Sequence, residues 1–260
     1  MSTKQIQGEL WSIAPANWAR YFEPCFIPMY KKALSYLELE EDTLVLDAGC
    51  GSGLFSQMVI DRGAGLIGID AAAGLLELAR KRNPGNNFLE EDLITLPFAS
   101  DSFDVVTGFN SLQYSGDFPR ALAEAKRVLK PGGLLVLGFW DKPEKSEATQ
   151  ILKSIAALLP PPPPGTPGPF ALSEDGVVEA AFDREGLQLV AREIVSCPQF
   201  YPNIAEALRS YLATGPAAAA LKQHQPARVE KTILRAFEPY GLGDGFFHLQ
   251  NSFLLFVGRK

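Results

Sequence analysis

An acidic residue followed by alternating glycines carries the clearest chemical signature in the chain. Residues 44–46 form a short apolar run, residues 47–53 read Asp-Ala-Gly-Cys-Gly-Ser-Gly, and residues 54–60 carry apolar side chains at helical spacing. Because glycine has no Cβ, such a turn lets the backbone approach a ligand closely. The N-terminus of the following helix also offers unpaired N–H groups to an anionic group. The pattern predicts a strand, a tight turn and a helix that together bind a nucleotide-like molecule.

A second acidic residue follows the next apolar run, where Leu66-Ile67-Gly68-Ile69 is followed by Asp70. An acidic side chain about 20 residues beyond such glycines can accept hydrogen bonds from both ribose hydroxyls. Asp70 also precedes the helical run of residues 72–82, so a role as helix N-cap is the alternative. Its position behind the glycine turn favours ribose binding.

The glycine spacing argues against a dinucleotide. The dinucleotide fingerprint is G-x-G-x-x-G/A, and reading from Gly49 its last position is Leu54. Asp47 is an additional acidic residue at the strand end, and the chain has no Tyr-x-x-x-Lys pair. A nicotinamide-dependent oxidoreductase is therefore the disfavoured alternative.

The order of the motifs resembles one enzyme family. Asp-x-Gly-x-Gly-x-Gly after an apolar strand is similar to motif I of the class I S-adenosylmethionine (SAM) dependent methyltransferases. Residues 87–93, 101–106 and 109–114 and the Leu-Lys-Pro-Gly-Gly junction at 129–133 follow in that family's order. More narrowly, residues 40–140 resemble the methyltransferase-11 type, which includes ubiquinone- and menaquinone-pathway methyltransferases and small-molecule tailoring enzymes.

The resemblance implies SAM as the cofactor and S-adenosyl-L-homocysteine (SAH) as its product. In this family Asp92 would accept from the adenine amino group, the Leu93 N–H would address the ring, and residues 109–114 would line the sulfonium and the methyl acceptor. The expected cofactor-binding residues are Asp47, Gly49, Cys50, Gly51, Gly53, Asp70, Ala71, Asp92, Leu93, Asn110 and Gln113.

Methyl transfer from SAM mainly needs alignment of the acceptor and exclusion of water. A general base helps only when the acceptor must lose a proton, and no motif places one. His224 and Tyr114 are weak candidates; His224 also reads as an exposed helix-end residue, and His248 as structural.

Aromatic residues are the candidates for lining the acceptor. Trp11, Trp18, Tyr21 and Tyr114 could wall a sulfonium, whose charge is attracted to ring faces. Packing of the N-terminal segment on the core explains these rings equally well.

Composition limits the partners. The formal net charge is −6, and the longest run of Lys and Arg is Arg80-Lys81-Arg82, so nucleic acid is an improbable substrate. No apolar run has the length of a membrane span. The three cysteines (Cys25, Cys50 and Cys197) lack metal-ligand spacing, which predicts no metal site and a reducing cytoplasm. Cys50 itself reads as a small apolar residue in a crowded turn rather than a nucleophile.

The chain outside the motifs is expected to form lids. The predicted organisation is an N-terminal helical lid (1–40), with a helix at 29–37, and a SAM-binding core (41–260) with insertions at about 143–186 and 200–243. In the first insertion we expect a stiff proline-rich connector at 160–169 and a helix that Ser173 caps and that stops at Gly186. The second should contain two helical runs separated by Gly215-Pro216, and residues 246–257 should form the last strand. The alternation of strands and helices predicts an α/β fold with parallel pairing. The resemblance implies a Rossmann-like, seven-stranded, mostly parallel sheet of order 3-2-1-4-5-7-6 with strand 7 antiparallel.

The predicted function is thus SAM-dependent methyl transfer to the O, N or C atom of a small molecule, flat or apolar. The alternatives are a nicotinamide-dependent oxidoreductase and a SAM-binding module without turnover. The sequence defines neither the acceptor nor the oligomeric state.

Overall fold

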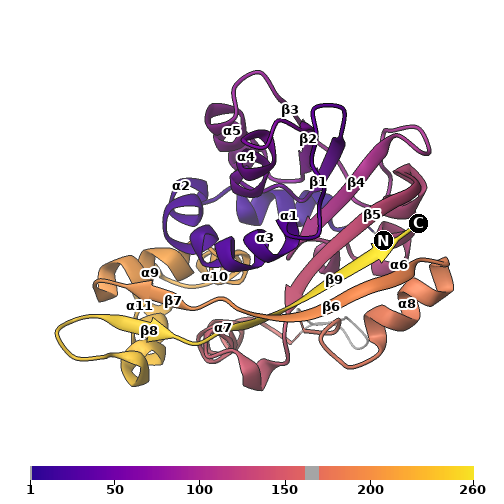
Figure 1. Ribbon diagram of the computed structural model, residues 1–260. Coiled ribbons are helices and arrows are strands. Elements are labelled where there is room, and N and C mark those ends of the chain that lie inside the picture. The colour runs from indigo at the N-terminus through magenta and orange to yellow at the C-terminus, as the bar shows by residue number, and fades with distance from the viewer. Residues whose placement is uncertain (1, 162–169) are drawn as a thin grey trace.

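The centre of the protein is a twisted seven-stranded sheet. The computed structural model describes residues 2–161 and 170–260. The strand order is β3-β2-β1-β4-β5-β9-β6, with parallel pairing from β3 to β5 and β9 antiparallel to both β5 and β6 (Figure 1). This confirms the expected order, with β9 as the seventh strand. The strands are β1 (Leu44–Ala48), β2 (Gly65–Asp70), β3 (Asn87–Glu90), β4 (Phe103–Phe109), β5 (Leu129–Trp140), β6 (Gln188–Ser196) and β9 (Ser252–Arg259).

The register brings the carboxyl ends of the first strands to one edge. Asp47 in β1 lies beside Gly68 in β2 and beside Thr107 in β4. The segments that leave β1, β2 and β4 therefore meet at one place, as expected for a parallel sheet whose strand order reverses next to β1.

Helices bury both faces of the sheet because each carries apolar side chains on one side. The helices α3 (Ile27–Leu34), α4 (Leu54–Ile60) and α5 (Ala73–Arg82) share one apolar cluster with Val45 and Val136. On the other face, α6 (Phe118–Val128) and α8 (Val177–Glu185) share a second cluster with the alternate strand residues Leu46 and Leu135.

The N-terminal segment folds across the edge where the strands end. It contains α1 (Lys4–Trp11), α2 (Pro15–Asn17), a π-helical turn η1 (Trp18–Phe22) and a 3₁₀ turn η2 (Glu23–Phe26) before α3. Gly8 of α1 lies so close to Ala71 that a Cβ would stand 2.3 Å from the Ala71 carbonyl oxygen. Glycine at this position therefore permits the contact between α1 and the sheet edge. The helix expected from residue 29 to 37 spans 27 to 34 instead.

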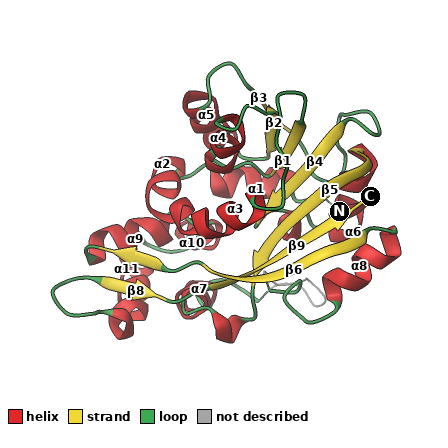
Figure 2. Cartoon of the chain, in the orientation of Figure 1, coloured by secondary structure: helices red, strands yellow, loops and turns green. Residues whose placement is uncertain are grey.

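The insertions form a helical lobe beside the N-terminal segment (Figure 2). β7 (Gln199–Tyr201), which follows β6, and β8 (Phe247–Leu249), which precedes β9, pair as a separate two-stranded antiparallel sheet. The lobe itself contains η4 (Pro143–Lys145), α7 (Ala148–Ala156), α9 (Ile204–Leu212), α10 (Gly215–Leu221), α11 (Pro226–Phe237) and η5 (Glu238–Tyr240).

Several local expectations were wrong in this region. The second insertion has three α-helices rather than two, because Gly215-Pro216 begins α10 with proline in its first turn instead of separating two runs. Residues 246–257 are not one strand, since Asn251 leaves the ladder and its side-chain oxygen accepts from the Ala148 N–H at 3.0 Å.

The start of α8 also differs from the expectation. Ser173 does not cap this helix: its hydroxyl donates to the Phe170 carbonyl, and Gly176 at φ +82° precedes the first turn. Most of the proline-rich connector expected at 160–169 lies outside the described residues.

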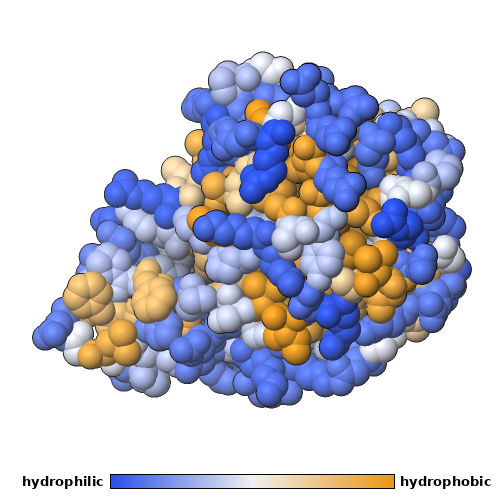
Figure 3. Space-filling model, in the orientation of Figure 1, coloured by the Kyte–Doolittle hydropathy of each residue, from blue (hydrophilic) through white to orange (hydrophobic). Residues whose placement is uncertain are grey.

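The face drawn in Figure 3 is mainly hydrophilic, with apolar side chains exposed near the β7–β8 pair. Phe200, Leu242 and Phe246 are each more than half exposed. Within residues 2–161 and 170–260, no helix is long and apolar enough to cross a membrane.

Candidate functional site

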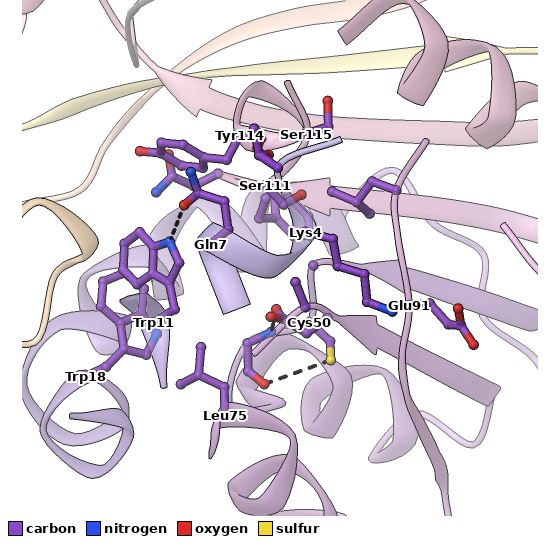
Figure 4. Close-up of a pocket in the computed structure, with 18 of the residues that line it drawn as sticks. Lys4, Gln7, Trp11, Trp18, Cys50, Leu75, Glu91, Ser111, Tyr114 and Ser115 are labelled. Atoms are coloured by element: carbon purple, nitrogen blue, oxygen red, sulfur yellow. Dashed lines mark hydrogen bonds between the residues drawn. The ribbon is translucent and has the colours of Figure 1, made fainter. Parts of the chain in front are cut away.

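A pocket lies where β1, β2 and β4 end, and the N-terminal segment forms one of its walls. It encloses about 810 Å³ of space, a figure that includes open solvent at its mouth. In Figure 4, Lys4, Gln7 and Trp11 of the N-terminal segment and Cys50 of the glycine turn stand around this hollow. Its walls are segments that the sequence motifs single out, together with α1, η1, η2 and α3.

The glycine turn forms the floor of the pocket. Gly49, Gly51 and Gly53 all have positive φ (+87°, +55° and +77°), which favours glycine at each. A Cβ at Gly49 would clash with the Ser111 Cβ at 2.2 Å, and one at Gly53 with the Asn83 Nδ2 at 2.7 Å. A Cβ at Gly51 would meet only the Glu23 Oε1 at 3.4 Å and the Trp18 Nε1 at 3.9 Å. Gly51 therefore keeps space open in the pocket, whereas Gly53 does not line it.

Asp70 lines the pocket and also supports the turn. Its Oδ2 accepts from the Gly51 N–H at 2.9 Å, and its Oδ1 accepts from the Ala72 N–H at 2.8 Å. Burial raises the pKa of this carboxyl. Because α5 begins at Ala73 and no side chain caps it, Asp70 bonds the residue before the helix rather than its first turn. Ala71 lines the pocket beside it.

Asp47 lies beneath the turn and does not line the pocket. Its carboxylate accepts from the Ser56 hydroxyl at 2.7 Å and from the Thr107 hydroxyl at 3.1 Å, so it joins β1 to α4 and β4. It is 2% exposed, and burial raises its pKa to about 7. The contacts of Asp47 fix the shape of the turn from below.

The segment after β3 brings Asp92 and Leu93 to the pocket. The Asp92 Oδ1 accepts from the Ile94 N–H at 3.1 Å, and the Ser2 hydroxyl donates to its Oδ2. Nearby, the Lys4 Nζ donates to the Glu90 carbonyl at 2.9 Å. These contacts attach the beginning of the N-terminal segment to the end of β3.

The segment after β4 supplies Asn110 and Tyr114 but not Gln113. Asn110 has φ +50° and lines the pocket, while the Gln113 Nε2 donates to its Oδ1 at 2.5 Å. The Ser111 hydroxyl donates to the Ala48 carbonyl at 2.7 Å and fixes this segment to β1. Burial raises the pKa of Tyr114 to about 12, so its phenol is protonated at neutral pH.

Two tryptophans form an aromatic wall. Trp11 and Trp18 both line the pocket, with ring centroids 4.8 Å apart at 74°. They also pack inside the protein. Trp18 stacks on Phe22 with ring centroids 4.6 Å apart, and Gly215 lies so close to Trp11 that a Cβ there would be 3.1 Å from the ring. These rings therefore line the pocket and pack inside the protein at the same time. Tyr21 does not line the pocket.

Glu23 is a pocket residue that the sequence reasoning missed. It is 2% exposed, and its Oε2 lies 3.0 Å from the Nη1 of Arg82. Its Oε1 accepts from the Ser52 N–H at 3.2 Å, and the Ser52 hydroxyl donates to its Oε2. These partners lie 29 and 59 residues away along the chain, so no local pattern reveals them. Burial raises the pKa of Glu23 against the opposing influence of Arg82.

The remaining candidates lie elsewhere or are unreactive. The His224 Nε2 is 2.6 Å from the Leu158 carbonyl, and the His248 ring stacks on Phe200 at 4.2 Å, both outside the pocket lining. Cys50 lines the pocket, but burial raises its pKa well above the ordinary value, so it is a thiol. In the described part of the chain, no three His, Cys, Asp or Glu side chains form a group that could hold a metal ion.

The insertions do not line the pocket among the described residues, although they were expected to cover the acceptor. They support its wall instead, since α10 packs on α1 and α9 packs on η1. The physical reason is that the N-terminal segment occupies the space directly above the strand ends.

Comparison with known proteins shows which proteins the central part of the chain resembles. Residues 46–137 match the family model described as a methyltransferase domain. A demethylmenaquinone methyltransferase of Renibacterium salmoninarum is 30% identical over 167 residues, which cover 64% of this chain and 59% of that protein. A malonyl-[acyl-carrier protein] O-methyltransferase of Serratia marcescens is 38% identical over 92 residues, which cover 35% and 36% of the two. The matches thus span less than two thirds of these relatives.

Solved structures share the fold over nearly the whole chain. A SAM-dependent methyltransferase of Thermotoga maritima has a TM-score of 0.58 at 17% identity and covers 97% of this chain and 99% of its own. The [4+2]-cyclase SpnF has a TM-score of 0.57 at 20% identity and covers 89% and 79%. At these identities the likeness concerns the fold alone.

Proposed function

We propose that this chain, which contains a class I SAM-dependent methyltransferase domain of the methyltransferase-11 type, binds SAM in the pocket and transfers its methyl group to a small-molecule acceptor. The observation that carries the proposal is the space above Gly51. A Cβ there would point into the pocket between Glu23 and Trp18, so the chain keeps open a place where backbone can approach a ligand.

The described residues fit such a ligand. An ionised carboxylate offers about four acceptor sites, and the contacts of Asp70 with Gly51 and Ala72 use two of them. The others are available to the two ribose hydroxyls. Asp92 and Leu93 would address the adenine, and Trp11 and Trp18 would face the sulfonium.

SAM would supply an activated methyl group, and the chain would supply orientation and a dry site. Orientation of two bound reactants can lower a barrier by about 7–11 kcal/mol. Tyr114 and Cys50 are protonated at neutral pH because burial raises the pKa of each, and His224 lies outside the pocket lining. The arrangement therefore favours catalysis by positioning over catalysis by any of these three as a base.

The pocket favours an uncharged, apolar or aromatic acceptor. Of the described residues that line it, Lys4 alone carries a positive charge, and its Nζ is engaged by the Glu90 carbonyl. An acceptor carboxylate would find no free cation there and would face Glu23, Asp70 and Asp92. In this respect the site is better suited to a ring, such as that of the substrate for which the demethylmenaquinone methyltransferase is named, than to a malonyl group. We propose residues 1–40 as the lid over this site.

Two measurements test the proposal. Calorimetry with SAM, SAH and NAD, each with and without a chelator, should show binding of SAM and SAH alone and no effect of the chelator. Transfer of labelled methyl from SAM should then be detected with a neutral aromatic acceptor. Preferential binding of NAD would overturn the cofactor, and tight SAM binding without transfer to any acceptor would support a binding module.

A further inference from the structure

Glu23 is a buried acid, and its contacts within the chain do not fully compensate the cost of burying its carboxylate. Taking a carboxylate out of water is costly unless partners satisfy it. Arg82 provides one positive charge, but its side chain is 26% exposed whereas that of Glu23 is 3% exposed. Of the described residues that line the pocket, Lys4 is the only cation, and the Glu90 carbonyl engages its Nζ.

The two oxygens of Glu23 differ in what they contact. Oε2 is occupied, because it accepts from the Ser52 hydroxyl and from the Arg82 Nη1 at 3.0 Å. Among the described residues, Oε1 accepts only from the Ser52 N–H, at 3.2 Å. The same Oε1 lies 3.4 Å from the position of a Cβ on Gly51. Its unused acceptor site is therefore next to the space that Gly51 leaves open.

We infer that Glu23 binds the α-ammonium group of the amino-acid end of SAM, with Ser52 and Arg82 holding its carboxylate in place. The inference rests on the proposed function. There the adenosine is held by Asp70 and Asp92, so the amino-acid end extends across the glycine turn toward Trp18 and Glu23. An ammonium at Oε1 adds a charge-assisted hydrogen bond and offsets the desolvation of a buried carboxylate.

This arrangement makes Glu23 a specificity residue for the amino-acid portion of the ligand. A ligand that has the adenosine and the sulfur but no amino group would not contact it. Glu23→Gln keeps the size of the side chain and an oxygen for the Ser52 N–H, but it removes the charge. The substitution should therefore weaken the binding of ligands that carry the α-amino group and spare those that lack it.

The experiment is a binding cycle with two proteins and two ligands. Calorimetry measures Kd of wild type and Glu23→Gln for SAH and for its desamino analogue, which lacks only the α-amino group. We expect Glu23→Gln to weaken SAH about tenfold or more, as for a hydrogen bond to a charged group, and to change the Kd of the analogue less than threefold. Glu91→Gln, which removes another pocket-lining carboxylate, is the matched control and should leave the ratio of the two dissociation constants unchanged.

The outcomes separate the possible roles of Glu23. Equal weakening of both ligands, or of neither, would show that Glu23 only anchors the N-terminal segment to Ser52 and would overturn the inference. Should Glu23→Gln fail to fold, the same cycle is measured with Glu23→Asp, whose carboxylate is shorter by one methylene. Weakening of SAH alone would again support the inference, and equal effects on both ligands would overturn it. If wild type binds neither ligand, both the proposed function and the inference are wrong. This failure is seen with wild type alone, whereas failure of the inference alone appears only in the comparison with the variant.

Discussion

Replacing Gly51 by alanine should abolish most cofactor affinity while leaving the protein folded. Of the three glycines in the turn, Gly51 is the suitable one, because a Cβ at Gly49 or Gly53 would clash with Ser111 or Asn83. The new methyl group would approach protein atoms no closer than 3.4 Å, an ordinary contact. The cost to stability is therefore mainly that of placing alanine at φ +55°, about 1–2 kcal/mol, or a few degrees in Tm for a chain of this size.

The cost to binding is larger because the methyl group occupies ligand space. Inserting a methyl group into a well-packed contact costs about 1–3 kcal/mol, which is roughly a fivefold to 150-fold increase in Kd. Calorimetry with SAH measures this loss directly, and thermal denaturation without ligand measures the stability.

Gly63→Ala is the matched control for this experiment. Gly63 has φ +89°, and a Cβ there would find no atom nearer than the Glu41 Cγ at 3.9 Å, away from the pocket. It should lower Tm by a similar amount and leave the Kd for SAH unchanged. If Gly51→Ala binds SAH within twofold of wild type, the backbone at Gly51 does not approach the ligand and the placement of the cofactor is wrong.

Three further predictions concern the same pocket. Asp70→Ala should weaken SAH binding about tenfold or more and lower Tm, since two N–H groups lose their acceptor. Asp101→Ala removes a surface pair with Lys260 at 2.6 Å at a residue outside the pocket lining and should leave Kd unchanged; equal effects of the two substitutions on Kd would count against the ribose contact. Burial raises the pKa of Asp47 to about 7 from its ordinary value of 3.8, so the folded state holds the proton more tightly. The resulting contribution to stability is complete below about pH 4 and is lost as pH rises to 7. The Tm of Asp47→Asn should therefore rise relative to that of wild type from pH 5 to pH 8, and a constant difference would contradict the raised pKa. SAH should change the tryptophan fluorescence of wild type, and Trp11→Phe should diminish that change. Trp140→Phe, at a buried site against Phe253, should preserve it. A fluorescence change that depends on Trp140 instead would place the ligand elsewhere.

The sheet could be predicted from the sequence because its signals are local. β1 and β2 follow from short apolar runs that each end in an aspartate, and the helices between the first five strands carry apolar spacing. Local patterns also located Gly51, Asp70 and Asp92 at the pocket. The antiparallel position of β9 followed from the resemblance rather than from any residue pattern.

The features that escaped prediction depend on distant parts of the chain. Glu23 reads locally as a surface residue, and only its contacts with Ser52 and Arg82 make it a buried pocket wall. Asp47 has the expected sequence position, but Ser56 and Thr107 draw its carboxylate beneath the turn. Residues 246–257 read as one strand, because the contact between Asn251 and Ala148 that interrupts it spans 103 residues.

The position of β9 has a consequence for the order in which the protein can assemble. Within the described part of the chain, β6 pairs with β9 alone in the main sheet, yet β9 begins at Ser252, 56 positions after β6 ends at Ser196. While the ribosome is still making the residues between them, β6 has no neighbour and one side of β5 stays open. Such a long-range pairing closes late, and the exposed strands are prone to wrong association in the meantime. The pocket half of the sheet, β1 to β4, can form during synthesis, whereas the other half must wait until residue 259 has emerged.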